Sequence, residues 1–202
     1  MKNKDKVLDV VFILDKSSSM SGSEENTISS FNEYLQREKN NNFSTNITTI
    51  LFSDNYSFLH KSMNIKEVNP ISSKDYYVGG CTALYDAIGN GINYIDPNHS
   101  DKVLFIIITD GYENASREFN KEKIKEMIKS RKYEFIYIGA DIDSYSAGNA
   151  IGISNDNIAN YVKDEAGTSL LFKGISRASK SMMNEESRGS WKEDLESYVD
   201  KK

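Results

Sequence analysis

Two runs of the sequence are almost entirely apolar and rich in β-branched residues: VLDVVFIL at residues 7–14 and KVLFIIITDG at residues 102–111. Such runs are typical of strands covered on both faces, because a strand with one solvated face alternates polar and apolar residues. We therefore expect both runs to be central strands of a sheet that is covered on both faces.

The rest of the chain alternates between helical and extended patterns. Residues 45–60 predict a pair of antiparallel strands around a turn at residues 53–55, and residues 133–140 and 157–162 predict further strands. Helices are expected over residues 21–39, 82–95, 120–132, 143–151 and 167–186, the first with a capping box formed by Ser21 and Glu24. This order predicts a doubly wound, Rossmann-like, mostly parallel α/β sheet with one antiparallel edge strand and helices on both faces. We expect a domain over residues 1–186 and a charged helical tail over 187–202 that docks on it.

Composition excludes several classes of function. The formal net charge of −5 and the dispersed lysines argue against nucleic-acid binding, which needs a concentrated basic face. A single cysteine cannot form an internal disulfide, and two separated histidines do not supply a zinc cluster. Since the sequence contains neither a membrane-spanning run nor a signal-peptide pattern, we expect a cytoplasmic monomer that does not bind membranes.

Polar side chains follow both apolar runs. Asp15, Ser17 and Ser19 alternate after the first run, so an extended chain would direct them to one side, and Asp110 lies near the end of the second. Ligands of doubly wound sheets bind beyond the carboxyl ends of the strands, where the strand order reverses. If the two runs are neighbours there, the carboxylates face each other, and Thr82, at the start of its helix, adds a third hydroxyl. Such oxygen donors suit Mg²⁺ or Mn²⁺ better than zinc.

The segments DKSSS (residues 15–19), GGCTALYDAI (79–88) and IIITDGYENAS (106–116) resemble the metal-ion-dependent adhesion site of von Willebrand factor type A domains. The similarity covers roughly residues 6–165, and TALYDAIG, ITDGYENAS and YIGADID resemble small, stand-alone bacterial and phage members. The sequence departs from many members at Lys16 and Ser18, which we expect to point away from the site.

The resemblance implies that Ser17, Ser19 and Thr82 contact a Mg²⁺ or Mn²⁺ ion, whereas Asp15 and Asp110 act largely through water. It also implies a binding module, without catalytic activity of its own, that receives an Asp or Glu carboxylate from a partner protein.

The main alternative is a magnesium-dependent phosphohydrolase, with Asp15 as the nucleophile and Asp110 helping to hold the metal. That class has a second acid two residues after the nucleophile, where this chain has Ser17, and a lysine further along. A third interpretation is a structural subunit whose site has lost its metal, which the full set of five ligand positions disfavours. A phosphatase assay and a magnesium-dependent binding assay distinguish the first two.

Other polar residues near these motifs have simpler interpretations. Glu113 and Asn114 lie near the rim of the site, where they either hold their loop through side-chain to backbone hydrogen bonds or contact a ligand. Asp86 is expected to be exposed or to cap its helix, with a supporting role behind the metal ligands as the alternative. Nothing near Cys81 is expected to lower the pKa of its thiol, which argues against catalysis. The helical spacing of Trp191 with later apolar residues indicates local packing of the tail.

Overall fold

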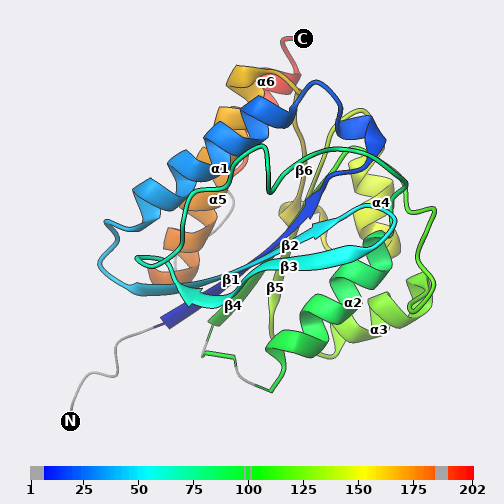
Figure 1. Cartoon of the computed structure of the whole chain (residues 1–202), viewed down its shortest axis with the longest axis horizontal. Helices are drawn as coiled ribbons and strands as arrows, with labels where there is room; N and C mark the ends of the chain where they lie inside the picture. The colour runs from blue at the N-terminus through cyan, green and yellow to red at the C-terminus, as the bar shows by residue number, and fades with distance from the viewer. Residues whose placement is uncertain (1–6, 98, 101, 185–190) are drawn as a thin grey trace.

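The computed structural model describes residues 7–97, 99–100, 102–184 and 191–202. In this part of the chain, one sheet lies between two layers of helices (Figure 1). The strand order is β3-β2-β1-β4-β5-β6, and every neighbouring pair is parallel except β2 and β3. The strands are β1 (Val7–Asp15), β2 (Ser44–Phe52), β3 (Tyr56–Asn64), β4 (Lys102–Thr109), β5 (Glu134–Gly139) and β6 (Ile158–Asn160). The predicted fold class, including the antiparallel edge strand, is confirmed.

Helices cover both faces of the sheet. One face carries α1 and α5, with α6 packed against α5, whereas α2, α3 and α4 lie on the other (Figure 1). The helices are α1 (Glu24–Glu38), α2 (Leu84–Ile95), α3 (Lys121–Lys129), α4 (Ser144–Ala150), α5 (Glu165–Asn184) and α6 (Glu193–Val199). Among the described residues, none of these helices combines the length and the hydrophobicity that crossing a membrane requires.

The strand β1 supplies side chains to two separate cores, which explains its nearly unbroken apolar sequence. Phe12 packs against α1 with its ring edge-on to Phe31 and Tyr34, at centroid distances of 5.1 and 5.2 Å. Val11 and Ile13 point the other way, into the core beneath α2. Because successive side chains of a strand face opposite sides, a strand buried on both faces must be apolar at almost every position.

The order of strands reverses at β1 and β4. From β1 the chain builds outward through β2 to β3, then returns to β4 and builds in the other direction. Leu14 lies opposite Ile108, so these two strands end level with each other at their carboxyl ends. Asp15 and Asp110 therefore meet at the reversal point, as the apolar runs predict.

The predicted capping box of α1 is wrong. Ser23 occupies the N-cap position without a side-chain hydrogen bond to the helix, and Ser21 instead donates its hydroxyl to the Ser18 carbonyl. A 3₁₀ turn over residues 18–20 and the positive φ of 85° at Gly22 separate Ser21 from the helix. Glu24 accepts the Gly22 N–H, so its carboxylate stabilises the turn.

The tail that begins at Trp191 packs on the domain. The Trp191 side chain is buried, and its indole N–H donates to the Asp156 carbonyl at 2.9 Å. Leu195 of α6 is also buried. The expected division between residues 186 and 187 falls within residues 185–190, outside the described part of the chain.

Candidate metal centre

The loop after β1 is fixed by hydrogen bonds from three directions. Asp15, nearly fully buried, accepts the Ser17 N–H at Oδ1 (2.6 Å) and the Thr109 hydroxyl at Oδ2 (2.6 Å). The Tyr76 hydroxyl donates to the Asp15 carbonyl at 2.5 Å. The Ser18 N–H donates to the Gly80 carbonyl at 3.0 Å, which joins this loop to the loop before α2. The loop therefore has a defined shape that rests on protein contacts alone.

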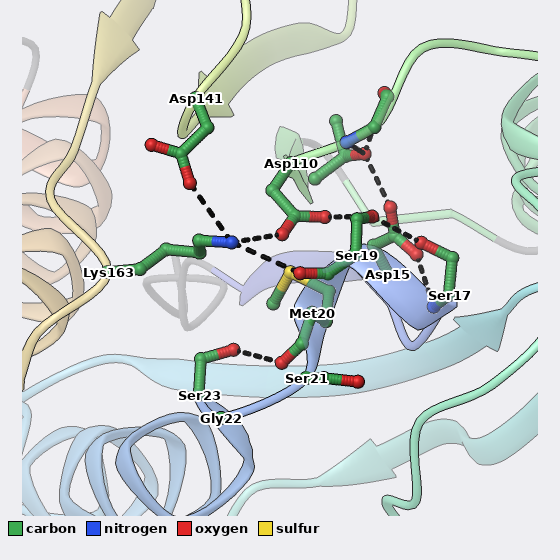
Figure 2. Close-up of polar contacts among 12 residues, drawn as sticks. Asp15, Ser17, Ser19, Met20, Ser21, Gly22, Ser23, Asp110, Asp141 and Lys163 are labelled. Carbon is green, nitrogen blue, oxygen red and sulfur yellow. Dashed lines mark hydrogen bonds and ion pairs between the residues drawn. The ribbon is translucent and has the colours of Figure 1, made fainter.

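The hydroxyls of the loop converge, although not by simple alternation along an extended chain. Ser17 has extended backbone angles, but residues 18–20 form the 3₁₀ turn, which brings Ser19 back toward Ser17. Their hydroxyl oxygens lie 3.0 Å apart, and Ser19 donates to Asp110 Oδ1 at 2.5 Å (Figure 2). Lys16 points away, with its ammonium 4.0 Å from the centre of the Tyr77 ring.

Thr82 borders the same space. A Cβ placed on Gly111 would lie 2.9 Å from the Thr82 Oγ1 atom and 3.3 Å from the Ser19 Oγ atom, so both hydroxyls face the Gly111 backbone. Reciprocal bonds with Asn114 hold Thr82: its N–H donates to the Asn114 side chain at 2.8 Å, and its carbonyl accepts the Asn114 N–H at 3.0 Å. The structure thus brings all five predicted positions, Asp15, Ser17, Ser19, Thr82 and Asp110, to one edge of the sheet.

The chemistry of this cluster fits a hard divalent cation. Five oxygen-bearing side chains gather there, two of them carboxylates whose residues are at most 5% exposed. Among the described residues, no group of three or more His, Cys, Asp or Glu side chains is arranged to hold a metal, so a site here depends on hydroxyls. Burial raises the pKa of Asp15, and the charge of Asp110 adds to this effect, whereas hydrogen bonds from Thr109 and Ser17 oppose it. A cation would relieve the repulsion between the two carboxylates.

One residue of the centre was not predicted from the sequence. Lys163, in the loop between β6 and α5, donates from Nζ to Asp110 Oδ2 at 2.7 Å and to the Ser19 carbonyl at 3.1 Å (Figure 2). It also lies 3.0 Å from Asp141 Oδ2. Burial lowers the pKa of Lys163, but its bonds to Asp110 and Asp141 outweigh this and hold the pKa above its ordinary value. A positive charge therefore already lies against the centre.

The acidic residues beside the centre bind loop backbone. Glu113 accepts the N–H groups of Tyr85 and Ser116 at 2.9 and 2.7 Å, as expected for a loop position. The expectation that Asp86 is exposed or caps its helix is wrong. Its buried carboxylate accepts three consecutive N–H groups of the loop after Asp110, those of residues 117–119, at 2.8 to 3.0 Å.

Cys81 is exposed and lies beside the carboxylate of Asp54. Its N–H donates to Asp54 Oδ1 at 3.0 Å, and this carboxylate raises the pKa of the Cys81 thiol. The thiolate, which is the reactive form of the cysteine, is therefore disfavoured.

A comparison with models of protein families identifies the family of this chain. The profile of the von Willebrand factor type A domain matches residues 9–173, which include every residue of the candidate centre. The chain belongs to the von Willebrand factor type A family. A comparison with curated proteins finds no significant match.

Solved structures of similar fold include a thread matrix protein of the mussel byssus and a pilus adhesin. Proximal thread matrix protein 1 from the mussel byssus aligns with a TM-score of 0.65 and 17% identity over 86% of this chain and 46% of its own. A second structure of that protein has zinc in its metal-ion-dependent adhesion site (MIDAS) motif. The pilus adhesin SpaC from Lactobacillus rhamnosus GG aligns with a TM-score of 0.71 and 15% identity over 89% of this chain and 30% of its own. At these identities the likeness concerns the fold, and this chain spans less than half of either protein.

Proposed function

We propose that this chain is a protein-binding module that holds a divalent cation, Mg²⁺ or Mn²⁺, at Asp15, Ser17, Ser19, Thr82 and Asp110. The observation that carries the proposal is the convergence of these oxygens from three separate loops at the strand-order reversal. The family assignment supports it, because type A domains are mainly interaction modules. A bound cation would supply a positive centre that accepts a carboxylate oxygen from an Asp or Glu of a partner protein.

The protein residues divide into neutral and charged donors. Ser17, Ser19 and Thr82 provide hydroxyl oxygens and leave the positive charge of a cation largely uncompensated. Asp15 and Asp110 are tied to protein hydrogen-bond donors, and we propose that they act through water. Since neutral ligands and one lysine leave the centre short of negative charge, an anionic group is the favoured partner.

Calorimetric titration with MgCl₂, MnCl₂, CaCl₂ and ZnCl₂ tests the metal. We expect Mg²⁺ and Mn²⁺ to bind with a stoichiometry of one, and Ca²⁺ more weakly because it prefers more ligands at longer distances. Zn²⁺ belongs in the series because a structural neighbour holds it. The variant Ser19→Ala should weaken Mg²⁺ binding about tenfold, or ~1.4 kcal/mol. Ser21→Ala, at an exposed serine that donates to the Ser18 carbonyl, is the matched control and should bind normally.

A peptide library tests the carboxylate. Displayed random peptides are selected on the chain in Mg²⁺ and eluted with chelator. Recovered peptides should contain an Asp or Glu whose replacement by Asn or Gln abolishes binding, and Ser19→Ala should not retain them. Enrichment of peptides without an acidic residue, or retention in chelator, would refute the carboxylate mechanism.

A magnesium-dependent phosphohydrolase is the second candidate, and Lys163 is the observation that favours it, because that class uses a lysine near its metal-binding acid. Two features favour binding instead: position 17 is a serine, and both oxygens of Asp15 already accept hydrogen bonds. We therefore expect no magnesium-dependent hydrolysis of p-nitrophenyl phosphate. Turnover that is lost in Asp15→Asn would support the enzyme.

A further inference from the structure

The Lys163 side chain forms a bridge between two carboxylates that differ in their surroundings. Its ammonium lies 2.7 Å from Asp110 Oδ2, on a side chain with no exposed surface, and 3.0 Å from Asp141 Oδ2, on a side chain that is 71% exposed. The lysine itself is 22% exposed, and its third contact is the Ser19 carbonyl at 3.1 Å. Figure 2 shows the three contacts diverging from the one ammonium.

This bridge changes the charge available to a metal. Asp15 and Asp110 carry two negative charges when ionised, and the ammonium on Asp110 neutralises one of them. These three groups together carry a net charge of −1. A divalent cation entering the centre would therefore meet only this one negative charge, with a positively charged ammonium close by. Because charges interact strongly where water is largely excluded, the lysine and the cation should oppose each other.

Asp141 offers the ammonium a second place. It lies in the turn between β5 and α4 with a φ of 55°, a left-handed conformation in which Asn is also well tolerated. Since the ammonium already contacts Asp141, a small movement of the flexible lysine could release Asp110 without leaving the positive charge unpaired.

We propose that Lys163 is a built-in counter-ion that competes with the divalent cation for Asp110, and that Asp141 holds the lysine when the cation is bound. The proposal rests on the proposed metal centre and goes beyond it by assigning a device that lowers its affinity. In the absence of metal, the lysine stabilises the buried Asp110 carboxylate. With metal bound, it lies beside the centre on Asp141.

Four single variants and one double variant test the device by MgCl₂ titration and by thermal melting in chelator. Lys163→Met keeps the apolar stem and removes the charge, so Mg²⁺ should bind at least tenfold more tightly while the melting temperature in chelator falls. Lys163→Arg keeps the charge and should bind Mg²⁺ as the unchanged chain does. Lys16→Met removes a lysine that follows Asp15 but contacts Tyr77, and its Mg²⁺ affinity should change less than twofold.

The fourth variant tests Asp141. Asp141→Asn confines the ammonium to Asp110, so Mg²⁺ should bind about threefold to tenfold more weakly. In the double variant Lys163→Met with Asp141→Asn, this weakening should vanish, because the lysine is gone. A weakening that persists in the double variant would mean that Asp141 acts by its own charge, which overturns its assigned role.

The two proposals fail in different ways. Unchanged or weaker Mg²⁺ binding in Lys163→Met, with a normal fold by circular dichroism, overturns the counter-ion and leaves the metal centre standing. If neither the unchanged chain nor Lys163→Met binds any divalent cation, the metal centre itself is refuted, and the counter-ion with it.

Discussion

Replacing Asp15 by Asn should separate metal binding from folding. In the metal-free chain, Oδ1 of Asp15 accepts the Ser17 N–H and Oδ2 accepts the Thr109 hydroxyl. An asparagine can keep the first bond through its carbonyl oxygen. Its amide can donate to the Thr109 oxygen, whose hydrogen can turn to the Gly111 carbonyl, 3.1 Å away. Both protein partners of Asp15, the Ser17 N–H and the Thr109 hydroxyl, would then keep a hydrogen bond.

Asp15→Ala, unlike Asp15→Asn, leaves one backbone hydrogen-bond donor without an acceptor. The Thr109 hydroxyl again has the Gly111 carbonyl, but the buried Ser17 N–H loses its acceptor, at a cost of about 1–3 kcal/mol. For a chain of this length, that corresponds to a melting temperature lower by about 2–12 °C. Asp15→Asn should melt at or above the temperature of the unchanged chain in chelator, because burial raises the pKa of Asp15 and so makes its charge costly.

Differential scanning fluorimetry with chelator and with MgCl₂ measures both effects. Mg²⁺ at ten times its dissociation constant should stabilise the unchanged chain by about 1.4 kcal/mol, or about 3–6 °C. Neither Asp15 variant should respond to Mg²⁺. If Asp15→Asn kept the full response, Asp15 would not belong to the metal centre. If it melted as low as Asp15→Ala in chelator, the hydrogen-bond exchange described above would be wrong.

Three further changes probe the centre, the core and the sheet edge. Gly111→Ala places a methyl group against the two site hydroxyls and should weaken Mg²⁺ binding at least tenfold, or ~1.4 kcal/mol, whereas Gly79→Ala, with open space around it, should not. Burial raises the pKa of the Glu38 carboxyl above its ordinary value of 4.5, so ionisation of this group opposes folding as the pH rises through the folded-state pKa. Glu38→Gln should therefore stabilise the chain at neutral pH and lose this advantage below about pH 4, as measured by urea unfolding curves. Phe58→Lys, on the edge strand, should lower stability by about 1–3 kcal/mol while leaving the Mg²⁺-induced melting shift intact; loss of that shift in a folded variant would contradict the layout of the sheet.

The parts of the fold that were predictable are those that local sequence determines. The apolar runs ending in Asp15 and Asp110 identify two doubly covered strands, and the structure shows that they are the neighbours at which the strand order reverses. The turn at residues 53–55 similarly gives β3 its antiparallel direction. These inferences need only the periodicity of side chains and the usual connections between strands.

The contacts that were missed depend on loop conformation. Lys163 is separated from Asp110 by 53 residues, and no pattern around it distinguishes it from other surface lysines. The sequence indicated the contact of Thr109 only weakly. A hydroxyl at the end of a wholly buried strand needs a hydrogen-bond partner, and in the structure that partner is Asp15. The capping box failed because a positive φ at Gly22 alters the chain path just before α1.

The loop contacts also bear on how tightly a metal can bind. The carboxylates of Asp86 and Glu113 accept hydrogen bonds from backbone N–H groups, and Asn114 pairs with Thr82. The loops that carry the centre therefore hold one another in place. Little conformational entropy then remains to be lost when a cation binds. Since ordering is already achieved by protein contacts, differences in affinity among the variants should reflect charge and ligand number. That is why Lys163, which alters the charge without being a ligand, is the most informative position at which to change the affinity of the centre.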